Sequence, residues 1–580
     1  MRRTVRAAMA LGVSLSVAAL ALAAPASAVP KKDPPGQLID VQVLAFNDFH
    51  GHVQPGDAGT VGGQDAGSAP YLAAKLNELR AGHKYSVTAA AGDLIGGSPF
   101  FSGLFHDEPA VESLNAMGLD VSSVGNHEFD EGVTELLRMQ NGGCHPVDGC
   151  YFEDEPFAGA DFQWLSANVV DEAGATPLPE YWIKKFQNVK VGFIGMTLEA
   201  TDTLVASSGV RGYEFLDEVE TANALVPELQ AQGVEAIVVL LHEGGIPNPI
   251  TVDGCANVSG PIVAINAGLD PAVDALVTGH THMPYNCTLP DPDGVDRMVT
   301  SAYSYGRVVS EVNLVLDKRT KDVRRDLSSA TNHAVLHNEL TPDAAQTAIV
   351  EKWEPLAAEI GDVPVGEITG DILRGGTPSG ADRGVESSAG NFAADVQQWS
   401  MSAAGSDLAF MNPGGLRSDL LYGQSSAGEA PGVVTFGEAQ TFQPFNNILS
   451  TFPMTGSQIV SVLEEQCQPA GSSRPILHLG VSDALTYDLA TTVETIGGVA
   501  TCTSVSVTNV LFEGAPIDPG ATYMVTANNF LADGGDSFTT FAEVDPADRI
   551  TGVSDLEALV NYLGTYSPVT PPGTDRVNEL

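Results

Sequence analysis

Acidic and imidazole side chains follow the first apolar run of the chain. In "LAFNDFHGHV", residues 44–53, Asp48 and His50 come directly after residues typical of a buried strand. On its own, an Asp-x-His pair is more often a hydrogen-bonded turn than a metal site. The pattern recurs after other apolar runs, and turn chemistry does not explain the repetition. The candidate metal ligands are Asp48, His50, Asp93, Asn126, His242, His280 and His282.

These residue types indicate a particular chemistry. Imidazoles and carboxylates suit zinc, manganese, iron or cobalt, and a central carboxylate can bridge two ions about 3.5–4 Å apart. Two such ions activate a water molecule and bind the oxygens of an in-line displacement at phosphorus. The sequence therefore predicts two divalent metal ions, with zinc, manganese or cobalt expected, and phosphoester hydrolysis. His127 is expected to stabilise the transition state or act as a general acid, with Asp130 fixing its ring.

The elements that position these residues are short apolar runs, which alternate with helical segments over residues 38–339 and predict a layered α/β domain. The candidate ligands follow such runs, and loops at the carboxyl ends of strands are where α/β folds build their sites. The expected strands are residues 39–46, 85–91, 189–196, 234–241 and 273–279.

A helix is predicted over residues 340–363, starting at Thr341–Pro342. Its expected apolar face consists of Ile349, Trp353, Leu356, Ala357 and Ile360. We interpret this helix as a linker, because residues 364–567 are richer in glycine and serine and predict a second, α+β domain. Residues 568–580 are expected to be a tail.

The N-terminus predicts export. Three arginines precede an apolar run that ends in Ala26-Ser27-Ala28, so residues 1–28 are expected to be a signal peptide and 29–37 a linker. The pattern does not decide between the general and the twin-arginine export routes. No later stretch is apolar enough to span a bilayer, so we expect a secreted, extracellular protein without a stable membrane anchor. With no evident association segment, a monomer is expected.

The six cysteines fall as neighbours in sequence, which in an exported protein favours three local disulfides. Six cysteines allow 15 pairings in principle, and the sequence does not choose among them. The neighbouring pairs are Cys144 and Cys150, Cys255 and Cys287, and Cys467 and Cys502.

The formal net charge of −46 argues against nucleic-acid polymers as partners, because such proteins usually carry a basic surface. If the substrate is nevertheless an anion, metal ions and a few arginines must supply the positive charge locally.

Four motifs together resemble those of the secreted 5′-nucleotidase family of calcineurin-like metallophosphoesterases. They are "NDFHG" at 47–51, "GD" at 92–93, "GNHEFD" at 125–130 and "GHTH" at 279–282. The resemblance covers nearly all of the chain after the predicted signal peptide. It implies an α/β/β/α metallophosphoesterase domain with a dinuclear site and a C-terminal domain that binds the nucleotide. By resemblance, Asp48, His50 and His282 bind one ion, Asn126, His242 and His280 bind the second, Asp93 bridges them, and His127 with Asp130 forms the catalytic dyad.

The same resemblance implies a substrate pocket in the second domain. In "RGVESSAGNF", Arg383 is the candidate phosphate ligand, with Asn391 in the same segment. In "NPGGLR", Asn412 would contact the base and Arg417 the phosphate, while Gly414 and Gly415 allow close approach of the backbone. In "QPFNN" and "NNFLADGGDSF", Phe445 and Phe530 would stack on the base, and Asp536 would accept hydrogen bonds from ribose.

The resemblance predicts a nucleotide substrate and hydrolysis of nucleoside 5′-monophosphates. Alternatives at the same site are UDP-sugar hydrolysis and 2′,3′-cyclic nucleotide phosphodiesterase with 3′-nucleotidase activity. A nucleotide-binding protein without catalysis would be expected to have lost ligands, yet the motifs are intact. Family members often carry another arginine shortly before Arg383, and its absence here favours monophosphates. His52, His83, His106 and His145 are interpreted as loop histidines.

Overall fold

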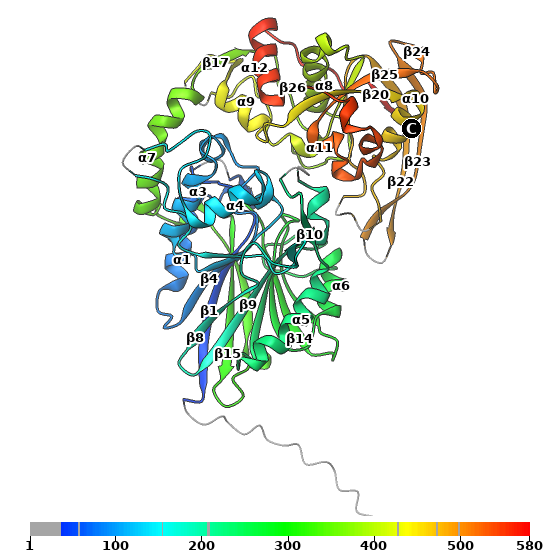
Figure 1. The fold of residues 1–580 in the computed structure, drawn as a ribbon. Coiled ribbons are helices and arrows are strands. Elements are labelled where there is room, and N and C mark those ends of the chain that lie inside the picture. Colours follow the sequence, from blue (N-terminus) through cyan, green and yellow to red (C-terminus); the bar gives the residue numbers. More distant parts are fainter. Residues whose placement is uncertain are drawn as a thin grey trace, which may run out of the picture.

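The computed structural model describes residues 36–580, except 56–57, 153–154, 206–208, 426–427, 471, 473 and 497–498. The expected signal peptide and most of the linker after it lie outside the described residues. The described chain forms two lobes, and helix α7 (Ala344–Gly361) connects them (Figure 1).

Two six-stranded sheets build the first lobe. One sheet has the order β16 (Ser329–Ala334), β15 (Val308–Asp317), β1 (Leu38–Phe46), β4 (Ser86–Ala91), β5 (Val121–Ser123) and β6 (Gln163–Leu165). The other has the order β13 (Pro284–Pro290), β14 (Asp296–Ala302), β12 (Val273–Thr278), β11 (Ala236–His242), β9 (Val189–Thr197) and β8 (Tyr181–Phe186). Two short pairs lie outside these sheets, β2 (Thr60–Val61) with β3 (Gln64–Asp65) and β7 (Val169–Asp171) with β10 (Tyr213–Phe215).

Side-chain alternation on the strands explains the layering. On β1, Val41 and Val43 belong to the core between the two sheets, whereas Leu44 and Phe46 belong to the core under the helices. Such a strand is apolar on both faces because both faces are covered. The first sheet is covered by α1 (Ala69–Arg80), α2 (Phe100–Gly103), α3 (Glu108–Met117) and α4 (Gly132–Asn141), and the second by α5 (Glu218–Ala231) and α6 (Pro261–Gly268). The predicted α/β/β/α arrangement is confirmed.

Helix α7 runs from Ala344 to Gly361, within the predicted range of 340–363. The side chain of Asp343 accepts hydrogen bonds from the backbone of Ala345 and Gln346 and thereby caps the first turn. Ile360, expected on the apolar face, is 44% exposed. The reason is that the neighbouring Gly361 packs against the Phe100 ring of the first lobe and turns Ile360 towards solvent.

The second lobe mixes parallel and antiparallel strands, as expected for an α+β domain. Its main sheet has the order β21 (Gly480–Val481), β18 (Leu408–Met411), β25 (Thr522–Asn528), β20 (Ile448–Thr455) and β26 (Ile550–Ser554). A second sheet has the order β24 (Ala515–Pro516), β23 (Val499–Phe512), β22 (Leu485–Ile496) and β27 (Val577–Glu579), and β17 (Pro364–Glu367) pairs with β19 (Val433–Thr435). The helices are α8 (Ser388–Ser400), α9 (Phe436–Phe442), α10 (Gly456–Glu464), α11 (Asn529–Ala532) and α12 (Asp555–Tyr566).

Residues 568–580 are more than a tail, because β27 pairs with β22 in parallel and Val577 is buried in the core of the lobe. Among the described residues, no helix combines the length and the apolar character needed to cross a membrane.

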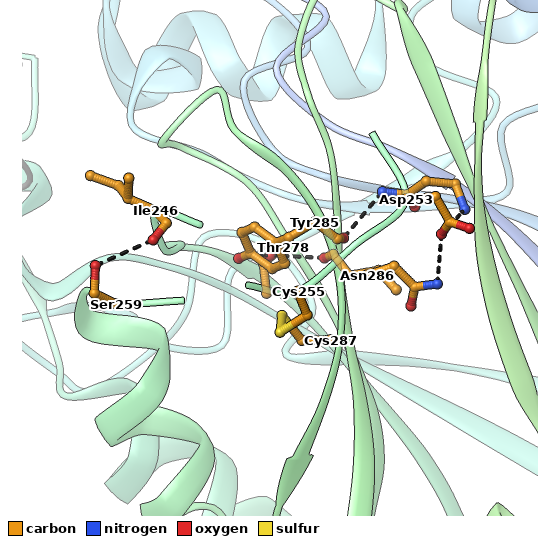
Figure 2. The surroundings of a disulfide bond; sticks show 10 residues. Ile246, Asp253, Cys255, Ser259, Thr278, Tyr285, Asn286 and Cys287 are labelled. Atoms are coloured by element: carbon orange, nitrogen blue, oxygen red, sulfur yellow. Dashed lines mark hydrogen bonds between the residues drawn. A yellow bond between two sulfur atoms is a disulfide. The ribbon is translucent and has the colours of Figure 1, made fainter. Parts of the chain in front are cut away.

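The cysteines pair as sequence neighbours, in three disulfides. The bond between Cys255 and Cys287 ties the loop that follows β11 to β13 (Figure 2). In the same loop, Asp253 accepts a hydrogen bond of 2.8 Å from the side chain of Asn286. This loop lies between two strand ends that carry candidate ligands, so the disulfide helps to fix the edge of the site.

Candidate metal centre and adjoining cleft

The structure brings all seven candidate ligands to one edge of the first lobe. Strands β1, β4 and β5 run parallel to one another, as do β9, β11 and β12, so their carboxyl ends meet there. The ligands are Asp48 and His50 after β1, Asp93 after β4, Asn126 after β5, His242 at the end of β11, and His280 and His282 after β12.

The ligand atoms form two groups around one carboxylate. In the first group, His282 Nε2 lies 3.1 Å from Asp48 Oδ1 and 3.2 Å from His50 Nε2. Asp93 Oδ2 lies 3.6 Å from His50 Nε2 and 3.0 Å from His242 Nε2, and thus faces both groups. In the second group, which contains Asp93, His242 and His280, the Nδ1 atom of His280 also lies 3.1 Å from the amide oxygen of Asn126.

The hydrogen bonds on the far side of the rings fit a metal site. His242 Nδ1 lies 2.7 Å from the carbonyl oxygen of Ala91, and His50 Nδ1 lies 2.7 Å from that of Gly96. A carbonyl oxygen only accepts, so each Nδ1 carries a proton, and Nε2 is the ring atom that faces the ligand group and can bind a metal. The Nε2 of His242 is buried and forms no hydrogen bond, although Asp93 Oδ2 is 3.0 Å away. Burial opposes a charged ring, but Asp93 and Asp48 raise the pKa of His242 to about 10, so these carboxylates favour positive charge here.

The backbone at these strand ends is strained. Five of the seven candidate ligands have positive φ, with values from 46° to 68°, namely Asp48, His50, Asp93, His280 and His282. This conformation is uncommon for residues other than glycine and typically persists where function requires it. Gly92, beside Asp93, is needed because a Cβ there would lie 2.5 Å from the backbone nitrogen of Gly125. The glycines of the sequence motifs therefore allow two strand ends to touch.

A buried carboxylate that the sequence did not single out supports this backbone. Glu128 accepts hydrogen bonds from the amides of Asp93 at 2.9 Å and Leu94 at 2.7 Å. Burial and the charge of Asp93 raise the pKa of Glu128 to about 7. Tyr305 was also missed, and its ring lies 5.3 Å from the ring of His282 and stacks on His52 at 4.0 Å. Only the "HEF" context signalled Glu128, and nothing in the sequence signalled Tyr305.

His127 and Asp130 lie together, as the motif predicts. His127 Nδ1 is 2.9 Å from Asp130 Oδ2, and the backbone amide of His127 donates to Asp93 Oδ1 at 2.9 Å. Burial opposes protonation, but Asp130 and Asp93 outweigh it and raise the pKa of His127 above its ordinary value. The Phe445 ring of the second lobe lies nearly parallel to that of His127, with 5.8 Å between centroids.

A cavity of about 540 Å³ opens between the lobes at this edge. Both members of the dyad line it, and so do all eight residues expected to bind substrate, which come from loops of the second lobe. These residues are Arg383, Asn412, Gly414, Gly415, Arg417, Phe445, Phe530 and Asp536.

Three arginines gather near this cavity around the carboxylate of Asp536, whose charge acts on all of them. Arg383 and Arg417 line it, and Arg474 lines a second pocket of about 500 Å³ that shares Arg383 with it. Among the described residues, none of the three forms an ion pair. Burial and the charges of Arg474 and Arg417 lower the pKa of Arg383 well below its ordinary value. Sequence reasoning missed Arg474, which a loop brings beside Arg383 from 91 positions later in the chain.

Two amide side chains are held by protein groups. Asn412 donates to Asp536 Oδ2 at 3.2 Å and accepts from Asn528 at 3.1 Å, so both ends of its amide already have partners. Asn391, expected in the pocket, is fully buried in α8 and donates to Glu386 at 2.7 Å. That expectation was wrong, because the segment after Arg383 turns into a helix whose inner face carries Asn391 into the core.

Two family models match the chain, one for each lobe. The model described as calcineurin-like phosphoesterase matches residues 41–284, and the model described as the C-terminal domain of 5′-nucleotidase matches residues 364–543. The chain belongs to the 5′-nucleotidase family. One matched model is that of a phosphoesterase and the other that of a 5′-nucleotidase domain, which places the chain among the phosphoric monoester hydrolases.

Similar proteins of the 5′-nucleotidase family span most of the chain. The cell wall protein Lmo0130 of Listeria monocytogenes is 32% identical over 90% of this chain and 67% of its own length. The NAD 5′-nucleotidase of Haemophilus influenzae is 26% identical over 95% of this chain and 94% of its own. The endonuclease YhcR of Bacillus subtilis is 31% identical over 92% of this chain, which spans only 40% of that protein. A 5′-nucleotidase precursor from Thermus thermophilus shares the fold, with a TM-score of 0.72, 23% identity, and coverage of 93% and 99% of the two chains.

Proposed function

We propose that the protein is a secreted, metal-dependent 5′-nucleotidase that hydrolyses nucleoside 5′-monophosphates to nucleoside and phosphate. One observation carries the proposal. The two groups of ligands around Asp93 adjoin a cavity that unpaired arginines and two phenylalanine rings line from the other lobe. A phosphate bound to a planar base needs both kinds of contact.

The ligand set fits two divalent ions. Asp48, His50 and His282 would hold one, Asn126, His242 and His280 the other, and Asp93 would bridge them. When bound, the ions lower the pKa of water and neutralise phosphate charge. Zinc, manganese and cobalt all accept this mixture of imidazole, carboxylate and amide ligands.

The protein's own groups would orient the phosphoester and assist the leaving group. His127, whose protonated form Asp130 and Asp93 favour, would donate a hydrogen bond or proton to an oxygen at the reacting phosphorus. His127 cannot rotate freely, because Asp130 holds its Nδ1 and leaves Nε2 as the donor.

In the second lobe, the phenylalanines would hold the base and the arginines the phosphate. Phe445 and Phe530 offer aromatic faces, and stacking of this kind accepts every base. Asp536 would accept from ribose hydroxyls, with Asn412 positioning it through the bond of 3.2 Å. Arg383 and Arg417 would bind phosphate oxygens with two donors each.

A second candidate activity is hydrolysis of nucleotides with two phosphates, including UDP-sugars. The sequence argued for monophosphates because no arginine precedes Arg383 closely, yet Arg474 lies beside it in the fold. We do not extend the endonuclease activity of the Bacillus relative to this protein, because the chain spans 40% of that protein and its formal net charge is −46. Cyclic nucleotides remain a third substrate class to test.

Export is part of the proposal. Three disulfides support an extracellular location, as does a relative described as a cell wall protein. A monomer stays a prediction, which the mass in solution will test.

The test is phosphate release by the purified protein from AMP, UDP-glucose and 2′,3′-cyclic AMP. Each substrate is assayed with and without chelator, and then with zinc, manganese or cobalt restored. Release from AMP that stops with chelator and returns with metal is the expected result. No release from any substrate by protein with two bound ions would overturn the proposal.

A further inference from the structure

A second cluster of histidines and carboxylates lies in the wall of the cleft. It consists of His106, Glu131, Glu135 and His145, whose candidate ligand atoms all lie within 4.8 Å of one another. None of these residues belongs to the ligand set around Asp93. His106 and His145 lie 39 positions apart in the sequence, and the fold stacks their rings with 3.7 Å between centroids.

The two rings are held from outside by one residue, Asp148. Its Oδ2 lies 2.8 Å from His106 Nε2 and 3.4 Å from His145 Nδ1, and its backbone amide donates to His145 Nδ1 at 3.1 Å. The other nitrogen of His106, Nδ1, lies 2.7 Å from Glu131 Oε2. Histidines that bind metals typically have their outer nitrogen held by a carboxylate in this way. A cation here would replace the proton between His106 Nδ1 and Glu131, and it would bind His145 through Nε2 in the tautomer that is protonated at Nδ1.

The charge around the cluster is unbalanced. Four carboxylates meet there, those of Glu108, Glu131, Glu135 and Asp148. Arg138 is the guanidinium within reach, and it bonds both Glu108 at 2.6 Å and Glu135 at 2.7 Å. With Arg138 and a protonated His106 as the positive charges, two negative charges remain on the side of the two imidazoles, and a divalent cation would neutralise them.

Three separate segments build the cluster and fix its geometry. His106 precedes α3, while Glu131 and Glu135 belong to the start of α4. His145 and Asp148 lie in the loop closed by the disulfide between Cys144 and Cys150. The histidine side chains are 18% and 13% exposed, so an ion could reach them without unfolding the lobe.

We propose that His106, Glu131, Glu135 and His145 form a third divalent-cation site, independent of the dinuclear centre and suited to zinc. Two imidazoles and two carboxylates are a usual ligand set for zinc, in tetrahedral geometry. Asp148 orients both rings, and Arg138 orients Glu135 by binding its other lone pairs.

Such an ion would stabilise the wall next to the dyad. Glu131 follows Asp130, whose carboxylate holds His127. On the other side, Asp107 accepts from the amide of Gly96 at 2.8 Å, and the carbonyl of Gly96 accepts from His50. The third ion would therefore act as a positioning element for both groups of reacting residues, and it would not contact the phosphate.

The experiment counts bound zinc per chain. The full chain is stripped with chelator, equilibrated with zinc, freed from excess zinc and analysed by mass spectrometry of the metal. The expected counts are three for the parent, two for the double variant His106→Gln/His145→Gln, and one for a variant with Asp93→Asn and His242→Gln. This last variant separates the proposal from the dinuclear centre, because the third site should still bind when that centre fails.

A matched control is His83→Gln/His333→Gln, since both of these histidines also face one carboxylate, that of Glu311, at 3.8 Å and 3.0 Å. Its count should stay at three. If the double variant does not fold, Glu131→Gln replaces it, because this is a milder change at a half-exposed side chain. Glu131→Gln should lower the affinity for one ion of the three by at least about tenfold. A parent that binds only two ions, or equal counts in the parent and the double variant, would overturn the proposal.

Discussion

The polar side chains at the strand ends of the first lobe and those on the loops of the second lobe are held in opposite ways. At the strand ends, Asp48 and His50 are fully buried, and each candidate ligand has a partner within the group or behind it. On the loops, Arg383, Arg417 and Arg474 lie close together, none forms an ion pair among the described residues, and the nearby Asp536 offsets their charge only in part. In a chain with 73 acidic residues and 27 basic ones, such a local excess of positive charge indicates a place for an anionic ligand.

The difference indicates a division of labour. The strand ends are arranged before substrate arrives, at the cost of a strained backbone at five positions. The loops carry repulsive positive charge that Asp536 offsets in part and that bound phosphate would relieve further. We infer that the first lobe sets the rate of the chemical step and the second sets which substrate is brought to it.

Asp93→Asn is expected to have the largest effect. The change removes a charge that faces both ligand groups but keeps the shape of the side chain. Activity should fall by more than the roughly 10³-fold typical of losing one transition-state donor. Phosphate release and metal content are measured together. Asp40→Asn, at an exposed position of β1, is the matched control and should keep full activity. Full activity of Asp93→Asn would contradict the metal assignment.

His127→Asn is expected to lower kcat by about 10²–10³-fold while the protein still binds two metal ions. The reason is that the ring would contact the substrate, whereas the seven metal ligands keep their positions without it. Asp130→Asn should give a smaller loss, since the ring remains but loses its fixed orientation. Steady-state kinetics together with metal analysis distinguish a lower kcat at full metal content from a loss of metal. If both variants lost their ions, His127 would be a structural residue.

Arg474→Ala should change selectivity. If this arginine binds a second phosphate, kcat/KM for UDP-glucose falls by roughly tenfold more than kcat/KM for AMP, which corresponds to about 1.4 kcal/mol for one charged hydrogen bond. Parallel assays of both substrates measure the ratio. Equal losses for the two would show that Arg474 does not distinguish one phosphate from two.

Arg383→Met is expected to stabilise the protein while it weakens substrate binding. Burial and two neighbouring arginines depress the pKa of Arg383, and a depressed pKa of a base means that its charge costs stability at any pH below that pKa. The free energy of unfolding should rise by about 0.5–2 kcal/mol. Arg374→Met is the control, because Arg374 pairs with Asp419 at 3.1 Å and its loss should destabilise. Denaturant titrations decide between the two signs.

The smallest expected effect concerns pH and the metal-free protein. Burial alone would lower the pKa of His106, but Glu131 and Asp148 raise it to about 9. The folded pKa exceeds the unfolded value of about 6.5, so this stabilisation is complete below pH 6.5 and is lost as the pH rises through 9. The loss should be on the order of 1 kcal/mol, since solvent screens the exposed partners. It should be absent in His106→Gln, as followed by denaturant unfolding between pH 6 and 10. Glu135 also raises the pKa of this ring, and its contribution is likewise lost in His106→Gln.

The metal centre was predictable from the sequence because its ligands lie within short motifs at strand ends. Gly92-Asp93 and Gly279-His280 each combine a glycine that permits close approach with a ligand beside it, so local sequence carries the geometry. Layering of the first lobe followed from apolar runs for the same reason. The prediction that Ile360 lies on the apolar face of the helix was wrong, because the packing of Gly361 on Phe100 is a tertiary contact.

Residues that act through the fold were not predictable. Arg474 reaches Arg383 from a loop 91 positions away, and the interpretation of His106 and His145 as loop histidines could not foresee that their loops meet. Asn391 looked like a pocket residue because it follows Arg383 closely, but its place on the inner face of α8 was decided by helix periodicity. The spacing of residues in the sequence predicts which side chains meet at the strand ends, but it does not predict which loops lie side by side.

The most direct test of the division of labour compares AMP with glycerol 2-phosphate, which has no ring to stack. Phosphate release is measured for the metal-loaded parent, for Asp93→Asn and for Phe530→Ala. Loss of one stacking face should cost about 1–3 kcal/mol of transition-state binding for AMP and little for glycerol 2-phosphate, whereas Asp93→Asn should abolish both. Equal losses for both substrates in Phe530→Ala would contradict the account, because the second lobe would then not be selecting the nucleotide.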